Sequence, residues 1–523
     1  MNEPLILVFD VGTQSLRAGL LNKRGEVLQV VQRRYEPPYY APAPNRAEQR
    51  PDAYFEHMCM ACQTLKSQAP ELFDRVAAAT LTVFRDSVLC LDAEGEPLSD
   101  CILWLDKREA EHPPQMPLWK RAVFSLVGMR RTIRMLQRAS VCNWLAENEP
   151  ELWAKTDKYV MLSTYLNKKI TGRLADSDAA QMGHLPFDYK HRRWDKGSLT
   201  RRLYAVRQGQ LCDIVPAGSV LGRVTETAAT LMGLPAGLPL ITAGADKGCE
   251  TLGLSVLGRD KAAISFGSAA SVELMTDKYF EPSPFLPSYP AVPAGYYNAE
   301  VQIYCGYWML TWFRQNFAAP EMAEAARRGC SAEEILNTHL AEVPPGCDGL
   351  MLLPYWCAGL EVPDARGAMV GFHEGHGKYH IYRAIIEGVN FGLMEGLRRM
   401  ERRSGQKIRA LYVGGGGSQS AEICQITADM FGLPVRRIHT HEASSVGAAM
   451  CAYVALGEYE SYEQAAEGMV RLRDEFLPDE KNHALYEQLY RRVYSRLYRR
   501  LRPLHRGLTE LIPSLRGEEE RHV

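Results

Sequence analysis

The pattern that most constrains the fold of this chain is a strand, a glycine turn and a second strand, and it occurs twice. The first copy covers residues 5–21 and turns at Gly12, and the second covers residues 262–275 and turns at Gly267. In both copies hydroxyl and small residues separate two apolar runs. Unless the likeness arises by chance, it predicts two related domains, the second of which starts near residue 255.

The first copy continues into an antiparallel meander. An apolar run at residues 27–31 follows the short turn "NKRGE", and consecutive strands with short turns pair in this way. The first strand ends at the carboxylate of Asp10, whereas Ser265 stands at the equivalent position of the second copy. Only the first copy therefore brings an acid to its turn.

The turn after Asp10 has the composition of an anion site. Backbone N–H groups of a glycine turn form an anion nest, to which Thr13, Gln14 and Ser15 add donors. Arg17 adds a planar cation that suits phosphate oxygens, and Asp10 beside a phosphate is explained by Mg²⁺ between them. The alternative is a structural hairpin in which Asp10 only caps the turn.

Length and composition exclude several classes of protein. A chain of 523 residues is too long for one core, so two or more domains are expected. The 61 basic and 62 acidic residues nearly cancel, which gives no bulk attraction to nucleic acid or membrane. No apolar run reaches the roughly 18 residues that span a bilayer, and no secretory signal is expected at the N-terminus. The scattered cysteines form no zinc or disulfide pattern, which favours reduced thiols and a cytoplasmic location.

Hydrophobic spacing outlines the rest of the chain. Helices are expected at residues 51–66, 383–403 and 444–457 and through most of 128–172, and strands at residues 76–84, 87–92 and 237–246. The tail at residues 490–506 is rich in Arg, with Tyr and Leu at helical spacing. It reads as a docked helix with a solvated face, and an anionic partner is the alternative.

Three later segments also combine glycines with polar groups. The strand at residues 237–246 ends at a second acid, Asp246, which could accept a proton from a substrate hydroxyl or simply cap a helix. The turn at Gly267 could hold a second phosphate. The glycine run at residues 414–417 lies between a strand and a helix and lets a ligand approach the backbone. It matches neither the dinucleotide fingerprint nor the P-loop, so a dehydrogenase is not expected.

In this order, the motifs resemble the FGGY family of carbohydrate kinases over nearly the whole chain. The matching segments are "FDVGTQSLRAGLL", "EQRPDAYFEHM", "PLSDCILWLDKRE", "KITGRLADSDAAQMGHLPFDYKHRRWD", "PLITAGADKGCETLG", "ISFGSAAS", "RGAMVGFHEGHGKYHIYRAIIEGVNFGL" and "GGGGSQSAEICQITADMFGLPV". The resemblance implies an α/β, two-domain actin-like ATPase fold of the ribonuclease H-like type, with an interdomain active-site cleft. The implied divisions are an N-terminal domain at residues 1–254, a C-terminal nucleotide domain at residues 255–480 and a helical tail at residues 481–523.

The same resemblance implies the chemistry of the site. Asp246 would be the general base for a sugar or polyol hydroxyl that attacks the γ-phosphorus of ATP, and Asp10 and Asp246 would hold Mg²⁺, facing each other across the cleft. Phosphoryl transfer needs mainly positioning and charge stabilisation. The implied ATP-binding residues are Thr13, Gln14, Ser15, Arg17, Gly267, Ser268, Gly415, Gly416, Gly417 and Ser420.

The substrate is less well defined by the resemblance. Arg85, Asp86 and Trp104 stand where glycerol kinases bind hydroxyl groups, and they are expected to contact the substrate together with Asp246. Two positions depart from glycerol kinases. Lys247 replaces the usual Gln and either contacts a more oxygenated substrate or forms an ion pair with Asp246 or Asp86. Ser271 replaces an aromatic residue and would leave room for a larger substrate.

We therefore expect an ATP- and Mg²⁺-dependent kinase of a small sugar or polyol, with no nucleic-acid or membrane partner. A glycerol kinase proper is the alternative within the family. A non-catalytic ATP-binding protein of the same fold is the alternative outside it, and it is disfavoured by the presence of Asp246. The oligomeric state stays open, with a homodimer as one option.

Overall fold

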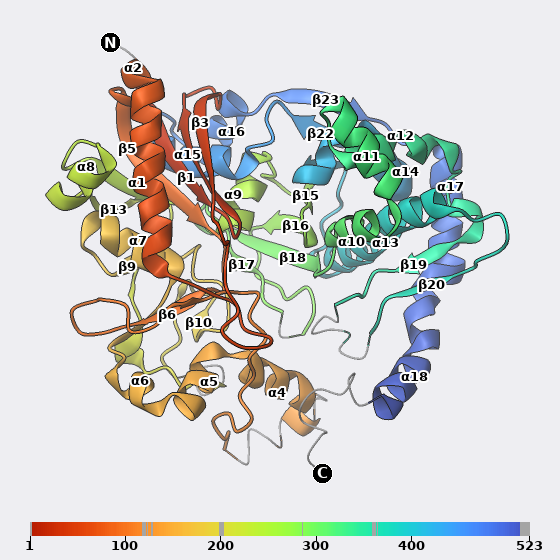
Figure 1. The fold of residues 1–523 in the computed structure, drawn as a ribbon, viewed down its shortest axis with the longest axis horizontal. Coiled ribbons are helices and arrows are strands. Elements are labelled where there is room, and N and C mark those ends of the chain that lie inside the picture. The colour runs from red at the N-terminus through yellow and green to blue at the C-terminus, as the bar shows by residue number, and fades with distance from the viewer. Residues whose placement is uncertain are drawn as a thin grey trace. The chain divides into compact units, whose positions relative to one another are not determined.

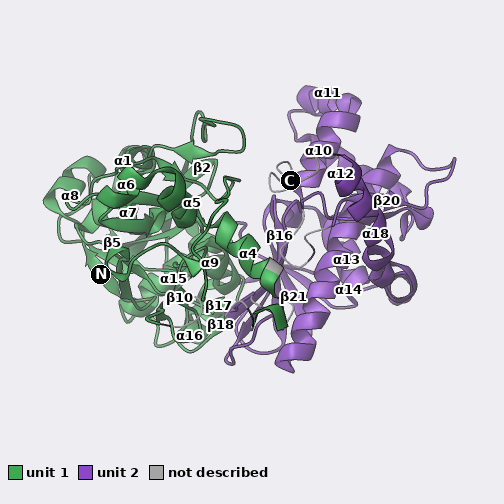
Figure 2. Cartoon of the chain, turned by 90° about the horizontal axis from the view of Figure 1, so that it is seen from below, with its two compact units in different colours: residues 1–255, 289–297, 442–470 green, residues 256–288, 298–441, 471–523 purple. Residues whose placement is uncertain are grey.

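The chain folds into two compact units (Figure 2). Unit 1 comprises residues 1–255, 289–297 and 442–470, and unit 2 comprises residues 256–288, 298–441 and 471–523. The structure, a computed structural model, describes residues 3–512 apart from 118–121, 123, 127–128, 198–202, 285, 358–361 and 363–364.

Unit 1 is built on a mixed sheet with the strand order β13–β14–β5–β1–β2–β3. The predicted meander at the N-terminus is confirmed, since β1 pairs antiparallel with β2 and β2 with β3. β5 and β14 continue the sheet parallel to β1. The strands of this sheet are β1 (Leu5–Val11), β2 (Ser15–Leu21), β3 (Val27–Arg34), β5 (Val76–Val83), β13 (Val220–Arg223) and β14 (Pro239–Thr242).

Smaller sheets and helices complete unit 1 (Figure 1). The short strands are β4 (Glu48–Gln49), β6 (Val88–Leu91), β7 (Cys101–Ile102), β8 (Lys158–Met161), β9 (Ala175–Ser177), β10 (Phe187–Asp188), β11 (Arg193–Trp194), β12 (Asp213–Val215) and β17 (Tyr289–Pro290). The helices are α1 (Pro51–Gln68), α2 (Pro70–Phe73), α4 (Arg130–Ala139), α5 (Val141–Asn148), α6 (Pro150–Lys155), α7 (Leu162–Thr171), α8 (Glu226–Met232), α9 (Asp246–Gly253), α15 (Ala443–Ala455) and α16 (Tyr462–Met469), with a 3₁₀ turn at Gln208–Gln210. α1 lies against β2 and β3, and α15 lies against β1 and β5.

Unit 2 has a sheet with the order β18–β16–β15–β21–β22–β23. Its strands are β15 (Lys261–Phe266), β16 (Ala270–Thr276), β18 (Tyr297–Ile303), β21 (Ala410–Gly414), β22 (Val435–Ile438) and β23 (Leu472–Phe476), and β19 (Met351–Leu353) pairs with β20 (Ala368–Val370) elsewhere. The helices are α10 (Trp308–Phe317), α11 (Ala319–Arg328), α12 (Ala332–Thr338), α13 (Lys378–Ser404), α14 (Ala421–Phe431), α17 (Glu480–Leu489) and α18 (Ser495–Leu511). Short 3₁₀ turns lie at His339–Glu342, Cys347–Gly349 and Gly416–Gln419, and a π-helical turn at Tyr490–Tyr494 leads into α18.

The two main sheets share one topology, which confirms the predicted repeat. In unit 1, the β1–β2 hairpin is followed by β5 and β14, both parallel to β1, and then by the antiparallel edge strand β13. In unit 2, the β15–β16 hairpin is followed in the same way by β21, β22 and the antiparallel edge strand β23. Because strand order and strand direction agree across both sheets, the likeness of the two turns is not a chance resemblance.

Three features differ from what the sequence suggested. Residues 442–470 lie within the expected C-terminal domain at residues 255–480 but pack in unit 1, because α15 covers α9 and β1. β14 ends at Thr242, and Asp246 is the first residue of α9 rather than the end of a strand. Cys305 and Cys357 form a disulfide, so the expectation of reduced cysteines throughout is wrong.

The expected tail is helical as far as the structure describes it, and residues 513–523 lie outside the described residues. Across the described part of the chain, we find no helix whose length and hydropathy would allow it to span a membrane.

Candidate active site

The residues predicted to carry the chemistry of unit 1 meet at one edge of its sheet. β1, β5 and β14 are parallel neighbours, so their carboxyl ends, and the loops that follow them, lie side by side. Asp10 lies near the end of β1, Arg85 and Asp86 follow β5, and Asp246 follows β14. The expectation that Asp10 and Asp246 lie on opposite sides of an interdomain cleft is wrong, because both belong to unit 1.

The turn after Asp10 is a tight hairpin that carries charged groups. The Gly12 N–H donates to the Ser15 carbonyl at 3.0 Å and closes the turn. Asp10 and Arg17 are direct cross-strand partners, and Arg17 Nη1 lies 3.9 Å from Asp10 Oδ2. The structural hairpin is therefore present, and it sets an acid and a guanidinium side by side next to its turn.

Trp104, which is predicted to contact the substrate, forms a hydrogen bond with Thr13, which is predicted to bind ATP. The indole N–H of Trp104 donates to Thr13 Oγ1 at 2.9 Å. The Trp104 side chain remains partly exposed, and its backbone N–H donates to Ser87 Oγ. Of the other predicted phosphate contacts in this turn, Gln14 is exposed and Ser15 Oγ accepts a hydrogen bond from Gln32. The Trp104–Thr13 bond ties the expected phosphate turn to the expected substrate side of unit 1.

Asp86 is held by His184, a residue that the sequence did not single out. His184 donates its backbone N–H to Asp86 Oδ1 at 3.0 Å, and its Nδ1 lies 2.8 Å from Asp86 Oδ2. Gly183 permits this approach, since a Cβ there would lie 2.2 Å from Asp86 Oδ1. Burial opposes ionisation, but the neighbouring His184 lowers the pKa of Asp86. The Arg85 guanidinium lies over the ring of Tyr289 at 5.4 Å.

Asp246 opens helix α9 and is surrounded by charges of both signs. Its Oδ1 accepts the backbone N–H of Lys247 at 2.8 Å. Burial raises the pKa of Asp246, the charges of Arg85 and Lys247 lower it, and Glu250 raises it. Lys247 Nζ lies 2.8 Å from Glu250 Oε2, a carboxylate that the sequence did not suggest as its partner.

Asp10 is buried, and its pKa is strongly raised. Burial raises its pKa to about 7, Arg17 opposes this shift, and Glu442, Asp246 and Glu250 add to it. Asp10, Asp246, Glu250 and Glu442 are thus close enough to influence one another electrostatically, with Arg17 opposing them. The sequence did not reveal Glu250 or Glu442 as members of this cluster. Glu250 is one helical turn beyond Asp246, but Glu442 is far from every motif of unit 1 in sequence.

The two phosphate turns predicted for unit 2 lie at the ends of adjacent parallel strands. β15 runs beside β21 with Ser265 opposite Gly414, so the turn at Gly267 and the glycine run lie next to each other. Two neighbouring residues hold the turn, since the Tyr307 N–H donates to the Gly267 carbonyl and the Trp308 N–H to the Ser268 carbonyl, both at 3.1 Å.

The glycine run combines close packing with an open surface. A Cβ on Gly415 would lie 2.8 Å from the backbone of Phe266, and a Cβ on Gly417 would lie 2.5 Å from the ring of Tyr307. A Cβ on Gly416 would meet nothing within 4 Å, and Gly416 and Ser268 are exposed. Exposed backbone beside a hydroxyl fits a ligand with phosphate groups.

Two residues of unit 2 that are predicted to contact a ligand form hydrogen bonds within the protein instead. Ser420 is the N-cap of α14, since its Oγ accepts the Ile423 N–H, and it also donates to Glu422. Ser271 is fully buried in β16, and its hydroxyl lies 3.0 Å from Glu273. This burial gives no support to a contact between Ser271 and a substrate.

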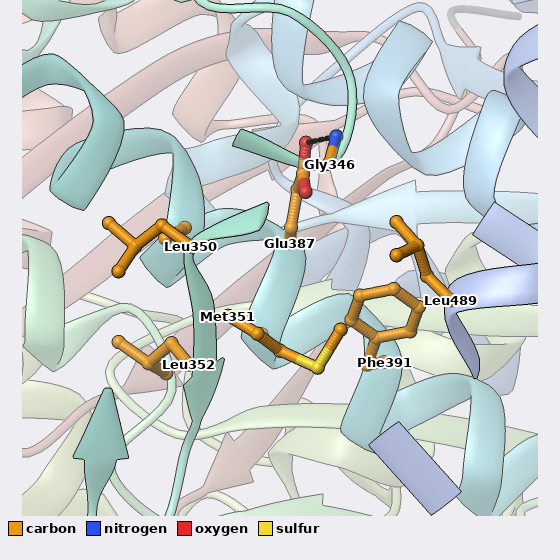
Figure 3. Close-up of a pocket in the computed structure, with 9 residues that line it drawn as sticks. Gly346, Leu350, Met351, Leu352, Glu387, Phe391 and Leu489 are labelled. Atoms are coloured by element: carbon orange, nitrogen blue, oxygen red, sulfur yellow. Dashed lines mark hydrogen bonds between the residues drawn. The ribbon is translucent and has the colours of Figure 1, made fainter. Parts of the chain in front are cut away.

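A small cavity in unit 2 is lined by none of these residues (Figure 3). It is lined by apolar side chains of β19 and α13, including Leu352 and Phe391, and by Glu387, which accepts the Gly346 N–H at 3.2 Å. Its volume of about 10 Å³ is close to the smallest space that holds one water molecule. It has no room for a sugar or a nucleotide.

The fold and these two groups of residues define a two-domain α/β sugar kinase. Residues 5–253 match the N-terminal domain and residues 262–456 match the C-terminal domain of the FGGY family of carbohydrate kinases, and the chain belongs to this family. It is a phosphotransferase with an alcohol group as acceptor, as the sequence predicted.

Similar proteins carry several kinase names. The chain is 28% identical to the "Uncharacterized sugar kinase YgcE" of Escherichia coli K12, over 94% of this chain and 92% of that protein. It is 27% identical to a xylulose kinase of Staphylococcus epidermidis, over 93% and 95% of the two chains, and 25% identical to a gluconokinase of Bacillus licheniformis, over 92% and 94%. The crystal structure of xylulose kinase from Rhodospirillum rubrum shares the fold with a TM-score of 0.80 at 24% identity, over 96% of this chain and 100% of that one.

Proposed function

We propose that this protein transfers the γ-phosphoryl group of ATP to a hydroxyl group of a small sugar or polyol, with Asp246 as the general base. The observation that carries the proposal is the edge of unit 1, where Asp246, Asp10 and the Arg85–Asp86 pair follow three neighbouring parallel strands. Phosphoryl transfer needs little covalent chemistry from the protein, so a set of well-positioned charges is sufficient.

Each group on this edge has a role in the proposal. Asp246 accepts the hydroxyl proton as the substrate oxygen attacks, and its raised pKa brings its proton affinity closer to the working pH. Arg17 and the hairpin turn bind the transferred phosphoryl group. Asp10 and Asp246 would hold Mg²⁺, which supplies charge neutralisation when it is bound.

The substrate is bound by groups that match hydroxyls. Asp86 keeps acceptor capacity, because its side chain is 32% exposed although both oxygens contact His184. Arg85 and the Trp104 side chain provide a donor and a partly exposed aromatic surface. The xylulose kinase and gluconokinase relatives make five- and six-carbon polyhydroxy compounds the first candidates. A glycerol kinase activity is the second candidate, which the Arg85–Asp86 pair favours.

The nucleotide side of the proposal lies in unit 2. Ser268 and the exposed backbone at Gly416 would bind phosphate groups of ATP, and Gly415 and Gly417 keep this backbone accessible. Thr13 and Gln14 of unit 1 would add contacts to the transferred group. We therefore assign the acidic edge to unit 1 and the glycine-rich edge to unit 2, as the structure bounds these units. A cytoplasmic location remains a prediction.

An ATP-consumption screen tests the function. The purified protein with Mg²⁺ is offered glycerol, erythritol, pentuloses, hexuloses, pentitols and gluconate, and products are identified by ³¹P NMR. We expect substrate-dependent ADP formation with at least one compound. The absence of turnover with all of them, in protein that binds ATP, would contradict the proposed substrate class.

The role of Asp246 is tested by Asp246→Asn. We expect loss of phosphoryl transfer by about 10³-fold or more, with binding of an ATP analogue retained, because the amide cannot accept the proton. Glu226→Gln is the matched control, since Glu226 is also the first residue of a helix in unit 1 but is exposed. Normal turnover in Asp246→Asn would rule out Asp246 as the base.

A further inference from the structure

Glu442 joins the acidic edge of unit 1 from a distant part of the chain. It occupies the N-cap position of α15, and its side chain is only 9% exposed. Its Oε1 lies 3.4 Å from Nε of Arg17, while Nη1 of the same guanidinium lies 3.9 Å from Asp10 Oδ2. Arg17 therefore lies between two carboxylates, and its contact with Glu442 is the shorter one.

The backbone that carries Glu442 is fixed to the helix that carries Asp246. α15 and α9 cross at two glycines, where a Cβ on Gly253 would lie 1.9 Å from the Ala443 carbonyl oxygen. A Cβ on Gly447 would lie 1.9 Å from the Cys249 carbonyl oxygen. Such close backbone contact leaves the two helices little freedom to shift against each other. Glu442 and Asp246 are thus held in a fixed relation.

We propose that Glu442 is a positioning residue, which holds one edge of the Arg17 guanidinium so that its other N–H groups stay available to the transferred phosphoryl group. The proposal rests on the function proposed above. A guanidinium is planar and has five N–H donors, so holding it along one edge fixes the direction of the rest. Without Glu442, Asp10 would be the remaining carboxylate in contact with Arg17, and the guanidinium would turn toward it.

Glu442→Gln and Glu442→Asp test the proposal. Glu442→Gln keeps the shape and removes the charge, and we expect kcat to fall about 10- to 100-fold because a misplaced phosphate contact costs that much. We expect the KM for the sugar to change less than about twofold, because Glu442 acts on the phosphate side. Glu442→Asp, which keeps the charge, is expected to recover part of kcat.

A double-mutant cycle with Arg17→Gln identifies the route of the effect. If Glu442 acts through Arg17, Glu442→Gln has no further effect on kcat in the Arg17→Gln background. The same cycle is measured for binding of Mg²⁺ and a non-hydrolysable ATP analogue by calorimetry. We expect each single change to weaken binding and the double change to weaken it no further.

Glu458→Gln is the matched control. Glu458 lies just beyond the other end of α15 and pairs with Lys23 at 3.0 Å in the same unit. We expect this variant to keep the kcat and the analogue affinity of the wild type.

The outcomes separate the two proposals. Independent losses in the double variant, or an unchanged kcat in Glu442→Gln, overturn the role of Glu442. If Glu442→Gln lowers the melting temperature and kcat and also changes the KM for the sugar, Glu442 has a structural role. This outcome also overturns the proposal. A wild-type protein that phosphorylates none of the compounds overturns the proposed function, while the binding cycle still tests Glu442.

Discussion

At the scale of single residues, the charge around Asp10 has a cost in the ligand-free protein. The raised pKa of about 7 means that folded Asp10 keeps its proton to a higher pH than unfolded Asp10, whose pKa is about 3.9. Between these values the folded state binds more protons, so folding stability from this group falls as the pH rises through that window. A bound cation would offset this negative charge and so stabilise unit 1.

Asp10→Asn should therefore stabilise the ligand-free protein while it removes activity. We expect a gain of about 2–4 kcal/mol at pH 8 and a smaller gain at pH 5, because part of the cost is absent at the lower pH. Thermal unfolding at both pH values measures this difference. Asp213→Asn, at an exposed position of unit 1, is the control and should show no such dependence. Equal gains at pH 5 and pH 8 would contradict the electrostatic explanation.

The hydrogen bond between Trp104 and Thr13 gives a second residue-level prediction. Trp104→Phe keeps an aromatic ring and removes the donor, and we expect kcat/KM to fall about 2- to 10-fold, the value of one hydrogen bond. Steady-state kinetics with the preferred sugar measure the loss. Trp194→Phe is the control, because Trp194 donates to the Cys212 carbonyl away from the acidic edge. It should lower the melting temperature and leave kcat/KM unchanged, and the reverse pattern would contradict the prediction.

At the scale of elements, the α9–α15 crossing is the tightest helix contact near the site. Gly253→Ala places a methyl group against the backbone of Ala443, which cannot move without displacing α15. We expect a loss of about 4 kcal/mol or more, or no folded protein. Urea unfolding and soluble yield measure the loss. Gly507→Ala is the control, because a Cβ there meets nothing within 4 Å, and it should gain up to about 1 kcal/mol from helix propensity.

Several elements could be predicted from the sequence because their signals are local. The hairpins at Gly12 and Gly267 have alternating apolar runs around a glycine turn, and α13 has a long apolar stripe that ends at Gly405 in a left-handed conformation. The start of α9 was one of two alternatives. Its sequence "DKGCETLG" contains two glycines and a short apolar pattern, so Asp246 could be read either as the end of a strand or as a helix cap.

The partners of the site residues could not be predicted, because tertiary contacts decide them. His184 holds Asp86 from about a hundred residues away, and Glu442 reaches Arg17 from beyond the glycine run of unit 2 in sequence. No local pattern around either residue indicates which partner it contacts. Ser271 shows the opposite case, in which a position chosen by resemblance is buried together with every other residue of β16.

At the scale of the whole molecule, one architecture occurs twice and the two copies carry different chemistry. The hairpin of unit 1 brings Asp10 to its turn, and the hairpin of unit 2 has Ser265 instead. In each unit, a strand pairs in parallel with the first strand of the hairpin. In unit 1 this strand is β5, which leads to the Arg85–Asp86 loop. In unit 2 it is β21, which leads to the glycine run. The repeated sheet thus supplies two similar edges, one of which is acidic and one of which exposes backbone.

The return of residues 442–470 to unit 1 predicts how the chain can be divided. A fragment of residues 3–255 lacks α15, so apolar surface of α9 and β1 is exposed, and we expect weak near-UV circular dichroism and dye binding. Fusing residues 442–470 to residue 255 through a short Gly-Ser linker should restore cooperative unfolding, because Gly253 already contacts Ala443. Cooperative unfolding of the fragment alone would contradict this prediction.

The same return of the chain matters during synthesis on the ribosome. When residue 255 has been made, α9 still lacks its partner helix α15, which follows only about 190 residues later. At about 5–20 residues per second, this interval lasts roughly 10–40 seconds. For that time the nascent chain presents an apolar helix face that only a chaperone or a premature contact can cover. The pace of translation through unit 2 therefore bears on the yield of correctly assembled unit 1.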